Sequence, residues 1–161
     1  MDSKTIFRQN ITALREYNEY STYYISKHTP LSLHYLLKLD SPTGLIRPKL
    51  YVFESLAKFY NIPVNLLLDA NLTDMLKSSQ RLPPFDHQMN LCNVLAENFK
   101  KQRTDKNLDV YKLSKLCLVD YRTLLKLEDN SLLKNMYLSF DTLDHLAALY
   151  NIPVPDFFKK P

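Results

Sequence analysis

Glycine is almost absent from this chain, since Gly44 is the only one in 161 residues. Loops that hold phosphate groups with backbone amides need several glycines, so nucleotide-binding folds built on such loops are excluded. Tryptophan is missing altogether. Cysteine is scarce, and Cys92 and Cys117 show neither a CxxC spacing nor the pattern of a disulfide framework.

Long apolar runs are also missing. No stretch approaches the roughly 18 residues that span a bilayer, and residues 1–9 lack the apolar centre of a signal peptide. We therefore expect a cytoplasmic protein with no membrane association. The four histidines have none of the spacings of a metal site, and no residues combine into a catalytic set. We expect no metal, no cofactor and no enzymatic activity.

The remaining composition is that of a globular protein, with 45% apolar and 24% charged residues. Residues 1–80 contain 9 basic and 7 acidic side chains, and residues 81–161 contain 12 and 10, so each half carries a net charge of +2. The basicity therefore belongs to both halves equally. This charge is compatible with binding to nucleic acid but does not demand it.

An internal repeat organises the chain. The segment 25–40, ISKHTPLSLHYLLKLD, returns 88 residues later as 113–128, LSKLCLVDYRTLLKLE. A second block, LAKFYNIPV at 56–64, returns at an offset of 90 as LAALYNIPV at 146–154. Self-similarity of this kind indicates duplicated structural units. We predict a first domain at 1–77, a linker at 78–87 and a second domain at 88–161.

Each copy is predicted to be helical. The spacing of Phe7, Ile11 and Leu14 is that of one helical face. Serine or aspartate then provides N-caps for two short helices in each copy, the second of them at 33–39 and 121–127. Turn-forming residues follow at 41–44 and 129–131. A fourth helix ends at the Asn-Ile-Pro-Val block, and a fifth is expected at 64–68 and 154–158.

Five short helices in this order resemble the Cro/cI-type (XRE, lambda-repressor-like) helix-turn-helix domain, and the resemblance covers nearly the whole chain, twice. The residues that carry it are Ile25-Ser26, Leu31-Ser32, Leu36 and Leu39-Asp40, and Leu113-Ser114, Val119-Asp120, Leu124 and Leu127-Glu128. The chain departs from the family at the turn glycine, which is Pro30 or Leu118, and at the glycine after the acidic residue, which is Pro42 or Asn130.

The resemblance implies an all-α protein of two tandem five-helix domains packed as an intramolecular pseudo-dimer. It also implies sequence-specific binding to double-stranded DNA by a transcriptional regulator, with repression as the expected role. In the family, the third helix enters the major groove. Carried over by position, the DNA-binding candidates are Thr22, Lys27, Ser32, Leu33, His34 and Lys38 in the first copy, and Lys115, Asp120, Tyr121, Arg122 and Lys126 in the second.

Arg122 is the strongest candidate for reading a base, because a guanidinium can pair bidentately with guanine. Contact with phosphate alone is the open alternative for Arg122. The lysine pairs Lys38 and Lys126, and Lys27 and Lys115, occupy equivalent places and are candidate phosphate contacts. In the first copy, Leu33 and His34 offer weaker base contacts.

Two domains in one chain could imitate the homodimer that single-domain relatives form. An extended linker of ten residues reaches about 33 Å, which is comparable with the roughly 34 Å between successive major grooves on one side of the duplex. Because the third helices differ in sequence, we expect the two half-sites to differ as well.

A protein-interaction module on a retained helix-turn-helix scaffold is the alternative function. Leu36 and Leu39 fill the inward spacing of their helix, so the adjacent Leu37 should face outward, and Leu125 repeats that position. Two outward leucines at equivalent places could serve a homodimer contact or a protein partner. The apolar Leu33 supports the same interpretation.

Overall fold

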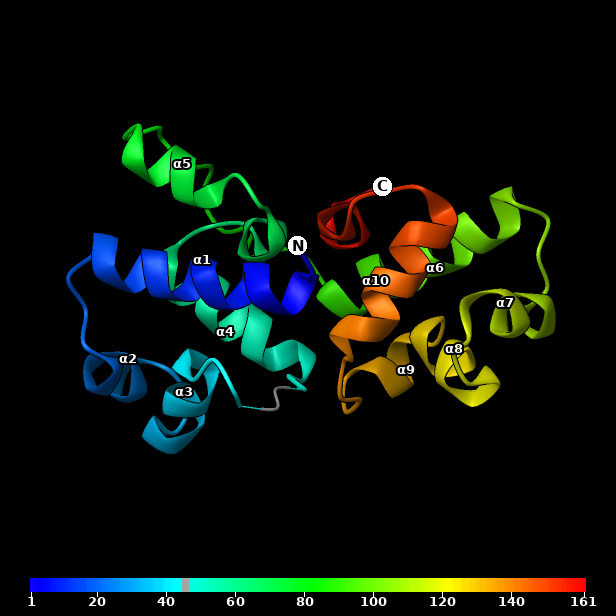
Figure 1. The fold of residues 1–161 in the computed structure, drawn as a ribbon, viewed down its shortest axis with the longest axis horizontal. Coiled ribbons are helices and arrows are strands. Elements are labelled where there is room, and N and C mark those ends of the chain that lie inside the picture. Colours follow the sequence, from blue (N-terminus) through cyan, green and yellow to red (C-terminus); the bar gives the residue numbers. More distant parts are fainter. Residues whose placement is uncertain (45–46) are drawn as a thin grey trace.

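The computed structural model describes residues 1–44 and 47–161, and every regular element in these ranges is a helix (Figure 1). The all-α class predicted from the sequence is therefore confirmed. The only β-type pairing in the same ranges is a single antiparallel bridge between Lys49 and Tyr137. Among the described residues, no helix combines the length and the apolarity required to cross a membrane.

The two halves of the chain repeat one order of elements. The first half contains α1 (Ser3–Tyr17), α2 (Thr22–His28), α3 (Leu33–Asp40), α4 (Leu50–Tyr60), the 3₁₀ helix η1 (Val64–Leu68) and α5 (Leu72–Lys77). The second half contains α6 (Leu91–Asp105), α7 (Val110–Cys117), α8 (Tyr121–Leu127), α9 (Asn130–Leu133), α10 (Phe140–Tyr150) and the 3₁₀ helix η2 (Val154–Phe158). Both α1 and α6 are 15 residues long, and α4 and α10 both have 11.

The predicted helices at 33–39 and 121–127 are present as α3 and α8. Ser21, Ser32, Asp109 and Asp120 each accept a hydrogen bond from a backbone amide in the first turn, so the predicted N-caps are confirmed. Leu36 and Leu39 are buried while Leu37 is 52% exposed, and Leu125 is 43% exposed. Both outward leucines therefore lie as predicted.

Four elements, η1, η2, α5 and α9, differ from the prediction. The fifth helix of each half is a five-residue 3₁₀ helix entered from a proline, Pro63 or Pro153, in extended conformation. The six residues of α5 are too few to show a helical period in the sequence. Residues 129–131 were predicted as a turn, but Asp129 instead caps the short helix α9, which buries Leu133.

A buried asparagine connects the first helix of each half to its 3₁₀ helix. The Asn10 side-chain amide donates to the carbonyl oxygens of Leu66, Leu67 and Asp69 at 3.3, 3.2 and 2.8 Å. Asn98, which is 88 residues later, donates to Asp156, Phe157 and Lys159 at 3.5, 2.9 and 2.8 Å. In each half, one side-chain amide therefore donates to backbone carbonyls in and just after the 3₁₀ helix, where the last carbonyls of a helix have no partner within the helix.

We expect Asn10→Ala and Asn98→Ala each to lower the free energy of unfolding by about 1–3 kcal/mol, because buried carbonyls would lose their donor. Chemical denaturation followed by circular dichroism measures the change. Asn65→Ala, on the partly exposed side of η1, is the matched control and should change stability by less than about 0.5 kcal/mol. Equal effects at Asn10 and Asn65 would contradict the assigned role.

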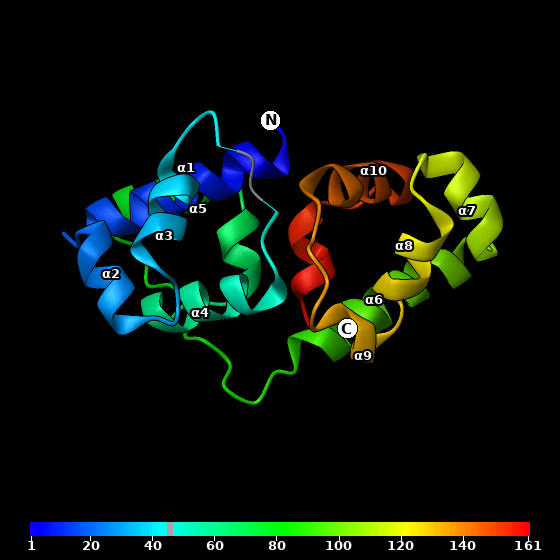
Figure 2. The same ribbon diagram turned by 90° about the horizontal axis from the view of Figure 1, so that it is seen from below.

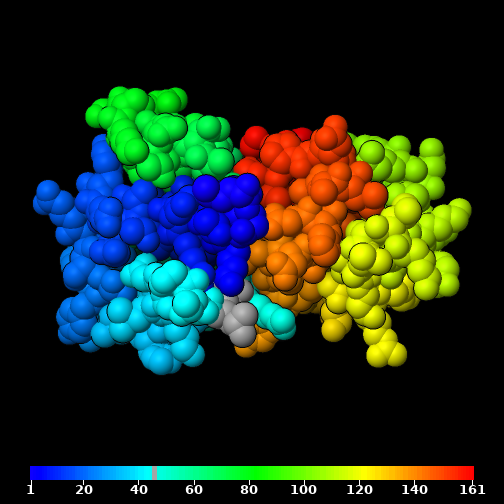
Figure 3. All heavy atoms as spheres, viewed as in Figure 1, coloured from blue at the N-terminus to red at the C-terminus, as the bar shows by residue number. Residues whose placement is uncertain are grey.

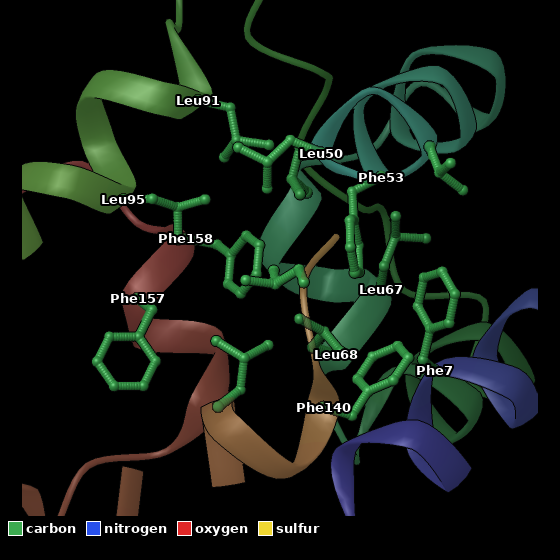
Figure 4. Close-up of a cluster of buried hydrophobic side chains, with 14 of the residues drawn as sticks. Phe7, Leu50, Phe53, Leu67, Leu68, Leu91, Leu95, Phe140, Phe157 and Phe158 are labelled. Atoms are coloured by element: carbon green, nitrogen blue, oxygen red, sulfur yellow. The ribbon is translucent and has the colours of Figure 1, made fainter. Parts of the chain in front are cut away.

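The halves share one hydrophobic core. Phe7 of α1 lies 5.4 Å from Phe140 of α10, and Phe53 of α4 lies 5.6 Å from Phe158 of η2, measured between ring centroids. Figure 4 shows these rings interleaved with leucines from both halves. The buried residues of the two halves form a continuous cluster, and the halves touch over much of the height of the molecule in Figure 3.

The contacts between the halves are reciprocal. Helix α1 packs against α10, and α4 packs against α6, while η1 and η2 pack on each other (Figure 2). By sequence offset, α6 is the equivalent of α1 and α10 is the equivalent of α4. Each half therefore presents the same pair of helices to the other. At the α1 end, the backbone amide of Ser3 donates to the Asp144 carboxylate at 3.2 Å, and the Ser3 hydroxyl donates to it as well.

Candidate nucleic-acid interface

Helices α3 and α8 lie on one side of the molecule, the lower side in Figure 1 and the near side in Figure 2. Each packs on the preceding short helix, and buried apolar side chains lie on both helices of each pair: Ile25 and Leu36 in the first half, and Leu113 and Leu124 in the second. A short turn separates α2 from α3 and α7 from α8. This arrangement leaves the first turn of both helices open to solvent.

The structure exposes ten of the eleven predicted DNA-binding residues and leaves Thr22 half-buried. The Thr22 hydroxyl donates to the Asp40 carboxylate at 3.3 Å, so it is directed toward α3. The side chains of Ser32 and Asp120 accept amide hydrogen bonds as caps. In the described ranges, no ion pair holds the charged ends of Lys38, Arg122 or Lys126.

In the second predicted lysine pair, Lys27 and Lys115, each lysine has an aromatic partner within its own helix. The Lys27 ammonium lies 5.1 Å from the centroid of the Tyr23 ring, and the Lys115 ammonium lies 5.3 Å from that of Tyr111. Both pairs have the i, i+4 spacing that brings side chains together on a helix, and cation–π attraction favours this geometry. The Tyr-x-x-x-Lys repeat was visible in the sequence and predicts this contact.

The turn between α7 and α8 contains an unusual leucine. Leu118 has φ 55° and ψ 28°, a left-handed conformation, and its side chain is 86% exposed. Glycine adopts this conformation without steric cost, whereas the β-carbon of a leucine is strained in it. In the first half, the same junction passes through Thr29 in extended conformation and Pro30, and no left-handed residue is needed.

We expect Leu118→Gly to raise the free energy of unfolding by up to about 1 kcal/mol, because relief of left-handed strain outweighs the entropy that glycine adds to the unfolded chain. Thermal unfolding of the two proteins measures the difference. Leu125→Gly removes a similar exposed side chain from helical backbone and should instead destabilise by about 1 kcal/mol. A lower free energy of unfolding for Leu118→Gly would show that the left-handed conformation of Leu118 does not strain the folded protein.

An arginine in the first helix of each half pairs with the acidic residue that ends the third helix. Arg103 donates to Glu128 through Nε and Nη2 at 2.6 and 2.8 Å, and through Nη1 to the Leu108 carbonyl at 2.8 Å. The hydrogen bonds with Glu128 raise the pKa of Arg103 above its ordinary value. The equivalent pair in the first half is looser, with Arg15 Nε 3.7 Å from the Asp40 carboxylate.

The two pairs should differ in their contribution to stability. Glu128→Ala leaves the Arg103 guanidinium without its bidentate partner at a site where both side chains are less than one-fifth exposed, and should cost about 3 kcal/mol. Asp40→Ala breaks a longer, more solvated pair and should cost about 1 kcal/mol. Urea denaturation of both variants measures the two losses in free energy of unfolding. A larger loss for Asp40→Ala than for Glu128→Ala would contradict the assignment of the stronger pair to the second half.

The loop after α3 is fixed by Arg8 of α1. Its guanidinium donates to the Pro42 carbonyl at 2.7 Å and also to the Gly44 carbonyl. Burial lowers the pKa of Arg8. A β-carbon on Gly44 would lie 2.8 Å from the Lys38 carbonyl oxygen, so close approach to the end of α3 requires glycine here. Gly44 is therefore required for this close approach and not for a left-handed conformation, since its φ is not positive.

Sequence reasoning missed the residues that lie between α3 and α8. Lys49 and Tyr137 meet in the antiparallel bridge, with the Lys49 ammonium 4.8 Å from the Tyr137 ring centroid. They are 88 positions apart in the chain and have different equivalents in the other half, so neither the repeat nor local spacing signals the contact. Only the packing of the halves brings them together.

Comparison of the chain with protein-family models, with curated proteins and with solved structures finds no match.

Proposed function

We propose that this chain binds double-stranded DNA in a sequence-specific manner as a transcriptional regulator. The observation that carries the proposal is that α3 and α8 lie on the same side of the molecule (Figure 2) and that the residues at the start of both helices are exposed. Major-groove reading requires a helix with free side chains at its N-terminal end. The family resemblance supports the regulatory role and suggests a repressor.

In this proposal the halves are tandem helix-turn-helix domains that pack as an intramolecular pseudo-dimer. The reciprocal packing of α1 on α10 and of α4 on α6 supports this organisation, because a twofold arrangement produces self-complementary contacts. One chain then covers two half-sites. The half-sites differ because α3 presents Leu33 and His34 where α8 presents Tyr121 and Arg122.

Arg122 and Lys126 have different roles in the proposal. The Arg122 guanidinium, free of ion pairs in the described ranges, reads a guanine, while Lys126 contacts phosphate. Lys38 has the phosphate role in the first half. Lys27 and Lys115, each stacked on a tyrosine, add positive charge beside the same helices.

Selection of bound sequences from random duplexes, followed by mobility-shift titration, tests the proposal. Arg122→Ala should cost about 1–3 kcal/mol and relax preference at one base pair, whereas Lys126→Ala should weaken all sequences alike and reduce the salt slope by about 1. If Arg122→Ala keeps the wild-type preference, α8 does not read bases as proposed. If selection enriches no sequence, specific DNA binding is rejected.

A protein partner is the second candidate, favoured by the exposure of Leu33, Leu37 and Leu125 on the same helices. Salt dependence distinguishes the two functions. Binding through several phosphates weakens steeply as salt rises, whereas an interface centred on leucines responds little. Leu37→Ser with Leu125→Ser should leave DNA affinity unchanged if DNA is the partner of this surface.

A further inference from the structure

The halves meet a second time on the side of the molecule that carries α3 and α8. Residues 47–49 run antiparallel to residues 137–139, and the Leu138 amide donates to the Pro48 carbonyl at 2.8 Å. These two segments lie between α3 and α8 in Figure 2 and on the lower side in Figure 1. A ligand that contacts both α3 and α8 would therefore also pass over this bridge.

Cationic and aromatic side chains gather at this bridge. We call Arg47, Lys49, Tyr51 and Tyr137 the central patch. Tyr137 is 61% exposed and carries the Lys49 ammonium over its ring, while Arg47 and Tyr51 are also exposed. Tyr35 of α3 lies beside them. Burial, with smaller contributions from Tyr51 and Tyr137, raises the pKa of Tyr35 to about 12.

We propose that the central patch binds the phosphates that border the minor groove between the two half-sites. This inference rests on the proposed DNA-binding function. Two helices that enter successive major grooves on one side of a duplex lie about 34 Å apart, and the minor groove passes between them. Arginine, lysine and tyrosine are among the side chains that donate to phosphate oxygens.

The patch is strongly asymmetric, and its asymmetry complements that of α3 and α8. At the offset of 90, Lys49 corresponds to Ser139, Arg47 to Tyr137, and Tyr51 to Asp141. Both cations therefore come from the first half, whose α3 has no arginine for bidentate base recognition. In this proposal the first half gains affinity by contacting the DNA phosphates between the two half-sites. The second half supplies the base contact through Arg122.

Lys49→Gln tests this inference on a duplex chosen by selection with the full chain. Loss of one phosphate contact should lower affinity about fivefold to tenfold at 0.1 M salt and reduce the slope of log affinity against log salt by about 1. Hydroxyl-radical protection between the half-sites should weaken, while protection within them remains. Lys58→Gln, an exposed lysine at the far end of α4, is the matched control.

Arg47→Gln provides a second variant, because Arg47 is exposed and lies outside the bridge pair, so it should leave folding intact. Circular dichroism checks the fold of each variant. Wild-type protection confined to the half-sites, or variants that behave like Lys58→Gln, would overturn the inference while leaving the proposed function standing. Absence of any protection on the duplex would reject both.

Discussion

Interleaving of aromatic rings across the two halves is the constraint on which the rest of the structure depends. Phe7 and Phe53 of the first half contact Phe140 and Phe158 of the second, and these side chains are almost completely buried. Separating the halves would expose all of them to water, at a cost of about 1.5–3 kcal/mol for each large apolar side chain. Because this shared core keeps the two halves together, it also fixes the distance between α3 and α8 and keeps both helices on the same side of the molecule.

Within each half, polar contacts transmit that rigidity from the core to the exposed helices. Asn10 and Asn98 connect the first helix to the 3₁₀ helix at the interface, and Arg103 connects it to the end of α8. In the first half, the contact between the first helix and the end of α3 is made differently. Arg15 is only loosely paired with Asp40, and Arg8 instead fixes the loop after α3. The two halves therefore share one order of helices, while the polar contacts that hold their third helices differ.

Much of this frame could be predicted from the sequence, because the repeat and the caps at Ser32 and Asp120 depend on local spacing. The outward position of Leu37 and Leu125 followed from the same helical period. The short helices α5 and α9 could not be predicted, since they span too few residues to show a period. The central patch could not be predicted for another reason, because Lys49 and Tyr137 are brought together only by packing of the halves.

A distance measurement between spin labels at positions 37 and 125 tests the central claim most directly. Both side chains are exposed and occupy equivalent places on α3 and α8, and labelling requires replacement of the free thiols Cys92 and Cys117. A shared core predicts one narrow distance distribution that is unchanged by dilution and by addition of a selected duplex. A broad distribution in the free protein that narrows only on DNA would show that the halves move independently, which would contradict the account.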